Sequence, residues 1–163
     1  MNIILKNKFL YFNEYKIKCA IGKRGITVKK KEGDNKTPAG LFKFKCIFYR
    51  KDRISKIKSK LKKFIIKKNM GWCDDSNSKF YNKLIKKPFN CSAEKLWLEK
   101  NIYDVIVVIN YNIKPIIKKK GSAIFLHIAR KKYLSTKGCI AISKKDMILL
   151  IKKIDTKTKL KIY

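Results

Sequence analysis

The chain has 163 residues, which is enough for one domain with a buried core and too few for two of ordinary size. Hydrophobic residues make up 45% of it, which excludes an intrinsically disordered chain even though 33% of the residues are charged. Its 43 Lys and Arg against 11 Asp and Glu give a formal net charge of +32, a field that attracts nucleic acids, anionic membranes or acidic cell-wall polymers. We expect a single domain over residues 1–163.

The N-terminal part of the chain is patterned for strands. Residues 2–21 predict two or three short strands, with turns at Asn7 and at Asn13 and Glu14. Residues 22–40 contain four of the seven glycines and therefore predict a loop.

The middle of the chain is more varied. Residues 41–49 alternate apolar side chains with lysines, which predicts a half-buried strand. Its apolar face would consist of Phe42, Phe44, Cys46 and Phe48. Residues 50–70 are basic and fit either an exposed strand pair or a short helix. Residues 71–85 are rich in turn formers and predict an ordered surface loop, and residues 92–98 predict a turn of helix.

The C-terminal part contains the clearest patterns. Residues 104–111 and 122–128 are apolar runs that predict strands buried on both faces. Residues 143–154 begin with an S-x-x-D capping box and carry apolar residues at helical spacing, so they predict a helix. Residues 157–162 predict an edge strand. The predicted fold class is mainly β, a sandwich or barrel-like domain with one or two short helices.

The positive charge does not by itself predict a nucleic-acid partner. Lysines run from Lys6 to Lys161 without one dense block, whereas nucleic-acid readers usually concentrate charge in a patch. Lys is accompanied by many Ile and Asn, a bias typical of A+T-rich codon usage. We therefore expect no specific nucleic-acid partner, although the field can assist an anionic substrate.

The five cysteines indicate neither a disulfide framework nor a zinc site, because their number is odd and no C-x-x-C occurs. They are Cys19, Cys46, Cys73, Cys91 and Cys139. No stretch approaches the ~18 apolar residues of a transmembrane helix. The N-terminus lacks the uninterrupted apolar region of a signal peptide.

The only histidine, His127, lies in the predicted strand SAIFLHI, and Cys139 follows twelve residues later in STKGCIAI. Each alone would be an ordinary core residue, but together they supply a thiol nucleophile and an imidazole base. An imidazole within hydrogen-bond reach lowers the thiol pKa, and the Lys137 ammonium would favour the thiolate further. Gly138 permits a sharp turn that would aim the amides of residues 137–139 at an oxyanion.

The segments FLHIAR and T-x-G-C-I-A, at residues 125–130 and 136–141, resemble the histidine and the nucleophile loop of the L,D-transpeptidase catalytic domain, the YkuD family. The segment GKRGITVKKKEGDNKTPAGLF resembles the family's glycine-rich segment, which ends in D-x-x-T-P-x-G. GWCDDSNSKFYN and LWLEKNIYDVIVVINYN are similar to segments of a compact branch of these domains. The resemblance covers about residues 22–151.

This resemblance implies a β-rich domain that rearranges bacterial peptidoglycan without a metal or a cofactor. Cys139 would form a thioester with a stem peptide and pass the acyl group to an amine acceptor. His127 matches the base, and the backbone carbonyl of Ile128 would orient its imidazole. The amides of Gly138 and Cys139 would bind the oxyanion.

Further residues are candidates for substrate contacts: Thr136, Lys137, Arg130, Arg50, Arg53, Trp72 and Asp74. The arginines could hold stem-peptide carboxylates, while Trp72 and Asp74 could line the cleft and meet the free amine of the substrate. The alternative is that Arg50 and Arg53 are solvated, and that Trp72 packs on a loop whose turns Asp residues cap.

Three features differ from the commoner pattern of the family. Lys137 and Ala141 stand where many members have histidine and arginine, and the loop from His127 to Cys139 is short. With these differences, one alternative function is an L,D-carboxypeptidase or amidase that uses the same dyad. An alternative from another class is a basic polyanion-binding protein whose dyad is vestigial. We expect a monomer in the periplasm or cell envelope, with a cytoplasmic location as the alternative because no signal peptide is visible.

Overall fold

The structure, a computed structural model, describes residues 1–28 and 30–163. In this part of the chain the strands are β1 (Asn2–Lys6), β2 (Phe9–Phe12), β3 (Tyr15–Ala20), β4 (Ile26–Thr27), β5 (Thr37–Pro38), β6 (Gly40–Tyr49), β7 (Lys62–Ile65), β8 (Met70–Cys73), β9 (Leu84–Lys86), β10 (Ala93–Lys95), β11 (Val105–Ile109), β12 (Phe125–Ile128), β13 (Ile140–Ile142) and β14 (Lys159–Ile162). The α-helix is α1 (Lys144–Lys153), and two 3-10 turns span Asn101–Tyr103 and Lys131–Tyr133.

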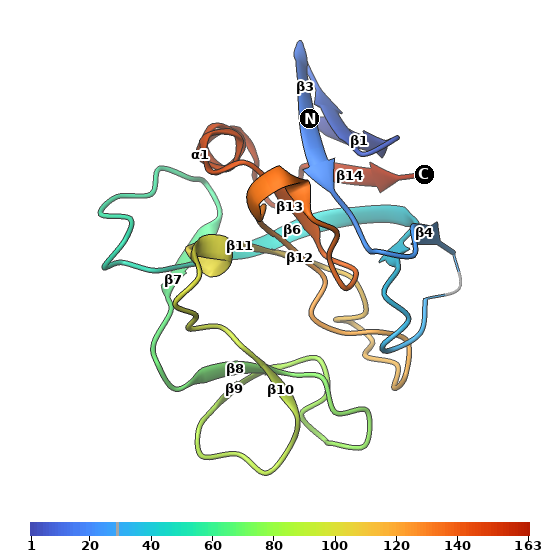
Figure 1. Cartoon of the computed structure of the whole chain (residues 1–163), viewed down its shortest axis with the longest axis vertical. Helices are drawn as coiled ribbons and strands as arrows, with labels where there is room; N and C mark the ends of the chain where they lie inside the picture. Colours follow the sequence, from blue (N-terminus) through green and yellow to red (C-terminus); the bar gives the residue numbers. More distant parts are fainter. Residues whose placement is uncertain (29) are drawn as a thin grey trace.

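Nine strands form one sheet in the order β11-β12-β13-β3-β2-β1-β14-β6-β7, and β6 also pairs with β11. The second pairing closes the sheet into a barrel-like form (Figure 1). The predicted mainly β fold class is therefore confirmed. β10, β8 and β9 form a separate three-stranded sheet, which lies at the opposite end of the molecule from β1 and β3 in Figure 1.

β11 is buried on both faces, as its continuous apolar sequence predicts. Val105 and Val107 point into the larger core, which also contains the apolar stripe of α1. Ile106 and Val108 point into a second core, which β11 and β12 share with Trp72 and other aromatic residues. The face of β12 that points to this second core carries the candidate site.

The helix predicted for residues 143–154 is confirmed as α1. Its N-cap Ser143 accepts a hydrogen bond from the Asp146 amide at 3.1 Å, and its hydroxyl donates to the Asp146 carboxylate at 2.6 Å. The predicted apolar stripe is buried in the larger core: Met147, Leu150, Ile151 and Ile154. Among the described residues, no helix is both long and apolar enough to cross a membrane.

Several predictions for the less regular segments are wrong. Residues 92–98 contain strand β10 rather than a helical turn, because β8 offers an edge with which it pairs. Residues 71–85 are not wholly a surface loop, since they include the buried residues of β8 and the strand β9. The C-terminal strand β14 lies between β1 and β6 and is not an edge strand.

The strand predicted at residues 41–49 is present, but its apolar residues do not share one face. Phe44 packs in the larger core, whereas Cys46 and Phe48 pack in the second core. The cause is a shift in the pairing register with β11 between Val108 and Ile109, which reverses the alternation of side chains.

The cap of α1 gives the first test. We expect Ser143→Ala to lower the free energy of unfolding by about 1 kcal/mol, because the Asp146 amide loses its acceptor. Urea denaturation measures the loss, with Ser55→Ala at an exposed position as the control. Equal stability of the two variants would show that the cap contributes nothing.

Candidate active site

The pairing of β12 with β13 places both residues of the sequence-predicted dyad on one side of the sheet, where they line the same cavity. The two strands are parallel, with His127 opposite Ala141 and Leu126 opposite Ile140. Because side chains alternate along a strand, Cys139 points to the same side as Ala141 and His127. Cys139 accordingly packs against the second core, near Phe125.

His127 is buried and fixed in orientation. Its Nδ1 lies 2.9 Å from the carbonyl oxygen of Ile128, and its ring packs edge to face on Tyr103 with 5.3 Å between ring centroids. Since a carbonyl can only accept, Nδ1 carries the proton and Nε2 holds the lone pair. Burial lowers the pKa of His127 to about 4, with a smaller lowering from the nearby charge of Arg130. The imidazole is therefore neutral at pH 7 and able to accept a proton at Nε2.

The Cys139 thiol is held by backbone groups of the facing chain. Its Sγ donates to the Ala123 carbonyl at 3.1 Å and accepts from the Phe125 amide at 3.4 Å. Burial raises the pKa of Cys139 to about 12, and the negative charge of Glu94 adds to the rise. The expectation that the thiol pKa is lowered is therefore wrong for the resting protein. The Phe125 amide and the Lys30 ammonium both lower this pKa, but burial raises it by more. The resting dyad consists of a neutral thiol and a neutral imidazole.

Both groups line one cavity of about 360 Å³. Among the sequence-predicted residues, Asp74, Arg130, Thr136 and Lys137 also line it. Cys139 as a residue is partly exposed and lines this cavity.

The loop before Cys139 is fixed by two threonines. Thr136 Oγ1 donates to the Cys139 carbonyl at 2.6 Å and accepts from the Gly138 amide at 3.1 Å. Thr37 Oγ1 donates to the Gly138 carbonyl at 2.9 Å and accepts from the Gly22 amide at 2.9 Å. The Thr136 hydroxyl thus holds the loop, while the residue also lines the cavity. The Gly138 amide is engaged by this hydroxyl.

Gly138 itself is required by the backbone. Its φ is +142°, a region open almost only to glycine, and an added Cβ would lie 2.8 Å from the carbonyl oxygen of Lys36. The sharp turn expected from the sequence is therefore present.

The cavity carries charges of both signs. Asp74 Oδ1 is buried without a hydrogen-bond partner among the described residues, and Glu94 accepts from the Tyr103 hydroxyl at 3.0 Å. Lys30 is 5% exposed and forms an ion pair with Asp34 at 2.6 Å. The combination suits a ligand that has both an ammonium group and a carboxylate.

Sequence reasoning did not single out Lys30, Glu94 or Tyr103 as site residues. Lys30 stands in a run of three lysines, where nothing distinguishes it from solvated neighbours. Glu94 is one of only 11 acidic residues in a strongly basic chain, and that rarity is the one signal that could have drawn attention to it.

The structure places the two arginines, predicted to contact substrate, outside the cavity. Arg50 forms a bidentate ion pair with Asp52, at 2.6 and 2.8 Å, and stacks on Trp97. Arg53 donates to Asp104 at 2.9 Å and to the Glu99 carbonyl at 2.7 Å. Neither lines the cavity, and both instead bind the protein's own chain. A guanidinium that is removed from water has to replace its hydrogen bonds to water, and carboxylates, carbonyls and aromatic faces of the protein can do so.

Trp72 also fails to line the cavity. Its indole is buried in the second core and donates to Asn82 Oδ1 at 2.8 Å. The same oxygen accepts from the Ala123 amide at 3.0 Å, and the Ala123 carbonyl accepts from the Cys139 thiol. Trp72 therefore supports the wall that holds the sulfur and lies outside the cavity.

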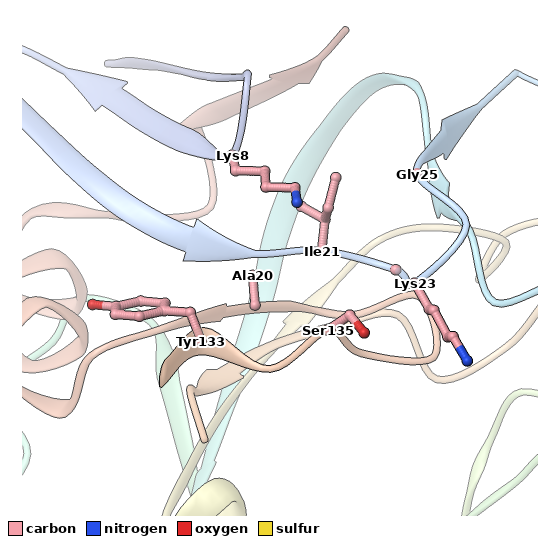
Figure 2. A pocket seen from close by; sticks show the side chains of 8 residues that line it. Lys8, Ala20, Ile21, Lys23, Gly25, Tyr133 and Ser135 are labelled. Atoms are coloured by element: carbon pink, nitrogen blue, oxygen red, sulfur yellow. The ribbon is translucent and has the colours of Figure 1, made fainter. Parts of the chain in front are cut away.

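A second cavity, of about 230 Å³, lies between the end of β3 and residues 133–135. Figure 2 shows Tyr133 and Ser135 on one segment and Ile21 and Lys23 on the segment facing it. The described residues that line this cavity include lysines but no thiol, imidazole or carboxylate. It therefore lacks the groups that acyl-transfer chemistry requires.

A barrel-like β domain with a thiol and an oriented imidazole in one cavity belongs to the class of candidate cysteine-nucleophile enzymes. The family model for YkuD, the L,D-transpeptidase catalytic domain, matches residues 4–162, so the chain belongs to this family. The family consists of cysteine-based enzymes whose activity concerns peptidoglycan. No curated protein matches the chain.

The approach of Gly138 to Lys36 gives the second test. Gly33 also has a positive φ, +72°, but an added Cβ there meets nothing within 4 Å. We expect Gly138→Ala to lower the free energy of unfolding by roughly 1–3 kcal/mol more than Gly33→Ala, because only Gly138 adds a clash to the backbone strain. Urea denaturation of both variants measures the difference. Equal losses would contradict the close approach.

Proposed function

We propose that the protein is an L,D-transpeptidase of the cell envelope, which forms a thioester between Cys139 and a peptidoglycan stem peptide and transfers the acyl group to an amine. The observation that carries this proposal is the single cavity that holds the Cys139 thiol and the His127 imidazole, with Nδ1 bound to Ile128. Family membership supports peptidoglycan as the substrate class.

The first step is acylation. The thiol exchanges its hydrogen bond to Ala123 for one to Nε2 of His127, which takes the proton as the sulfur attacks the carbonyl of the L-centre of a diamino acid. The Ile128 carbonyl stabilises the imidazolium through Nδ1. The imidazolium then gives its proton to the amine of the terminal D-residue, which leaves as the thioester forms.

The second step resolves the thioester. An acceptor amine attacks the acyl carbon, Nε2 takes a proton from the amine nitrogen, and that proton returns to the sulfur as Cys139 leaves. Because the imidazole starts and ends neutral, the cycle needs no external acid, base, metal or cofactor. Water in place of the amine would give an L,D-carboxypeptidase or amidase.

Two groups are proposed to stabilise the tetrahedral intermediates. The amide of Cys139 is the first oxyanion donor, whereas the Gly138 amide would have to leave Thr136 Oγ1 before it could help. The Lys30 ammonium, which favours the thiolate, adds positive charge beside the same sulfur.

Three cavity residues are proposed to bind the charged groups of the stem peptide. Asp74 has a buried, unpartnered oxygen suited to an ammonium group, and Arg130 and Lys137 are exposed cations suited to carboxylates. Arg130 keeps one contact within the chain, to the Ser135 carbonyl at 2.9 Å.

The dyad is tested with tetrapeptide-bearing muropeptides and mass analysis of the products. We expect dimers from the wild type, none from Cys139→Ser, and a fall of about 10²–10⁴-fold in rate for His127→Gln. Cys91→Ser, assayed under reducing conditions, is the matched control because Cys91 is partly exposed but does not line the cavity. Trimmed monomers alone would indicate hydrolysis, and normal activity of Cys139→Ser would refute the proposal.

The neutral resting dyad predicts the pH dependence of acylation. The pKa of His127 is lowered to about 4 and that of Cys139 is raised to about 12, so the active protonation state persists between these values. We expect a flat acylation rate across neutral pH that falls only as the pH approaches 4, where the imidazole becomes protonated. Single-turnover kinetics over this range measure it. An acidic limb centred near pH 6.5 would mean that the imidazole is not desolvated as described.

A further inference from the structure

Two cysteines outside the catalytic cavity lie close together. The Sγ atoms of Cys73 and Cys91 are 3.3 Å apart. Cys73 is the last residue of β8, and Cys91 precedes β10, which pairs with β8 so that Ala93 lies opposite Cys73. The Asp74 amide also donates to the Ser92 carbonyl at 3.2 Å. The backbone of Cys73 and Asp74 therefore pairs with the segment that follows Cys91, and this pairing sets the separation of the two sulfur atoms.

We propose that Cys73 and Cys91 form a reversible disulfide that ties β8 to the segment leading into β10. The sulfur atoms would have to move from 3.3 Å to the bond length of about 2.05 Å, which small side-chain rotations can supply. The odd number of cysteines is no obstacle. Among the other three, Cys19 and Cys46 are buried. The Cys139 sulfur is hydrogen-bonded to the backbone of Ala123 and Phe125.

The oxidant is a low-molecular-weight disulfide such as oxidised glutathione. Cys91 is partly exposed and lines a surface groove with Phe80, Leu84 and Phe89, so its sulfur is the accessible one. The Cys91 thiolate attacks the oxidant and releases one thiol, and the Cys73 thiolate then attacks the Cys91 sulfur and releases the second. The protein loses two protons and two electrons, and one oxidant molecule becomes two thiols. Burial raises the pKa of Cys73, so this thiol is less ionised than one of ordinary pKa and is the poorer candidate for the first attack.

The bond would join the two chain segments that carry carboxylates of the catalytic cavity. Asp74 follows Cys73 directly, Glu94 lies on β10, and both line the cavity. The oxidised protein would thus hold one wall of the site more rigidly than the reduced protein. The cross-link does not depend on the proposed function, because its presence is measured without any substrate.

The experiment equilibrates the full-length protein in glutathione buffers of increasing oxidised fraction, then denatures it and alkylates it with N-ethylmaleimide. We expect five alkylated cysteines at the reducing end and three at the oxidising end. Tryptic digestion without reduction should release residues 69–79 joined to residues 87–95, and mass analysis separates this species from glutathione adducts. We also expect the Tm to rise by about 5–10 °C on oxidation, for a cross-link between residues 18 apart.

Two variants complete the test. Cys91→Ser should keep the Tm of the reduced wild type and lose both the joined peptide and the shift on oxidation. Cys46→Ala, which removes a thiol outside the pair, should keep the joined peptide. Five alkylated cysteines at every glutathione ratio, or a bridge that involves Cys139 in place of Cys91, would overturn the proposal.

Discussion

The parallel pairing of β12 and β13 is the constraint on which the site depends. It sets His127 opposite Ala141, and the alternation of side chains then turns Cys139 to the same side of the sheet. A shift of one residue would turn the sulfur to the opposite face. Thr136 and Thr37 hold the loop that enters β13, so contacts within the chain fix the position of Cys139.

Burial determines the chemistry of this site more than charge does. The protein carries a formal net charge of +32, yet the cavity gathers three carboxylates, from Glu32, Asp74 and Glu94, and the thiol pKa is raised. Desolvation keeps both members of the dyad neutral, and the Ile128 carbonyl takes the orienting role that a carboxylate has in other triads. Proton transfer would then occur during attack on the substrate, and the resting enzyme would hold little reactive thiolate.

The sequence predicted elements whose signal is local. The capping box at Ser143 and the apolar run of β11 needed no tertiary information, and the motif around Cys139 pointed to the family. Predictions were wrong where pairing between strands that are distant in the sequence determines the structure. β10 forms because it pairs with β8, and β14 becomes interior because β1 and β6 flank it. The proximity of Cys73 to Cys91 has no signal in their spacing, because it arises from strand register.

Because His127 is the only histidine, its imidazole can be observed alone, and a ¹⁵N NMR titration of the ring tests the central claim most directly. The orientation by Ile128 and the burial of the ring predict a neutral imidazole with the proton on Nδ1, persisting until the pH falls to about 4. A ring protonated on Nε2, or one that titrates near pH 6.5, would contradict the proposal that a buried imidazole, oriented by Ile128, acts as the base for Cys139.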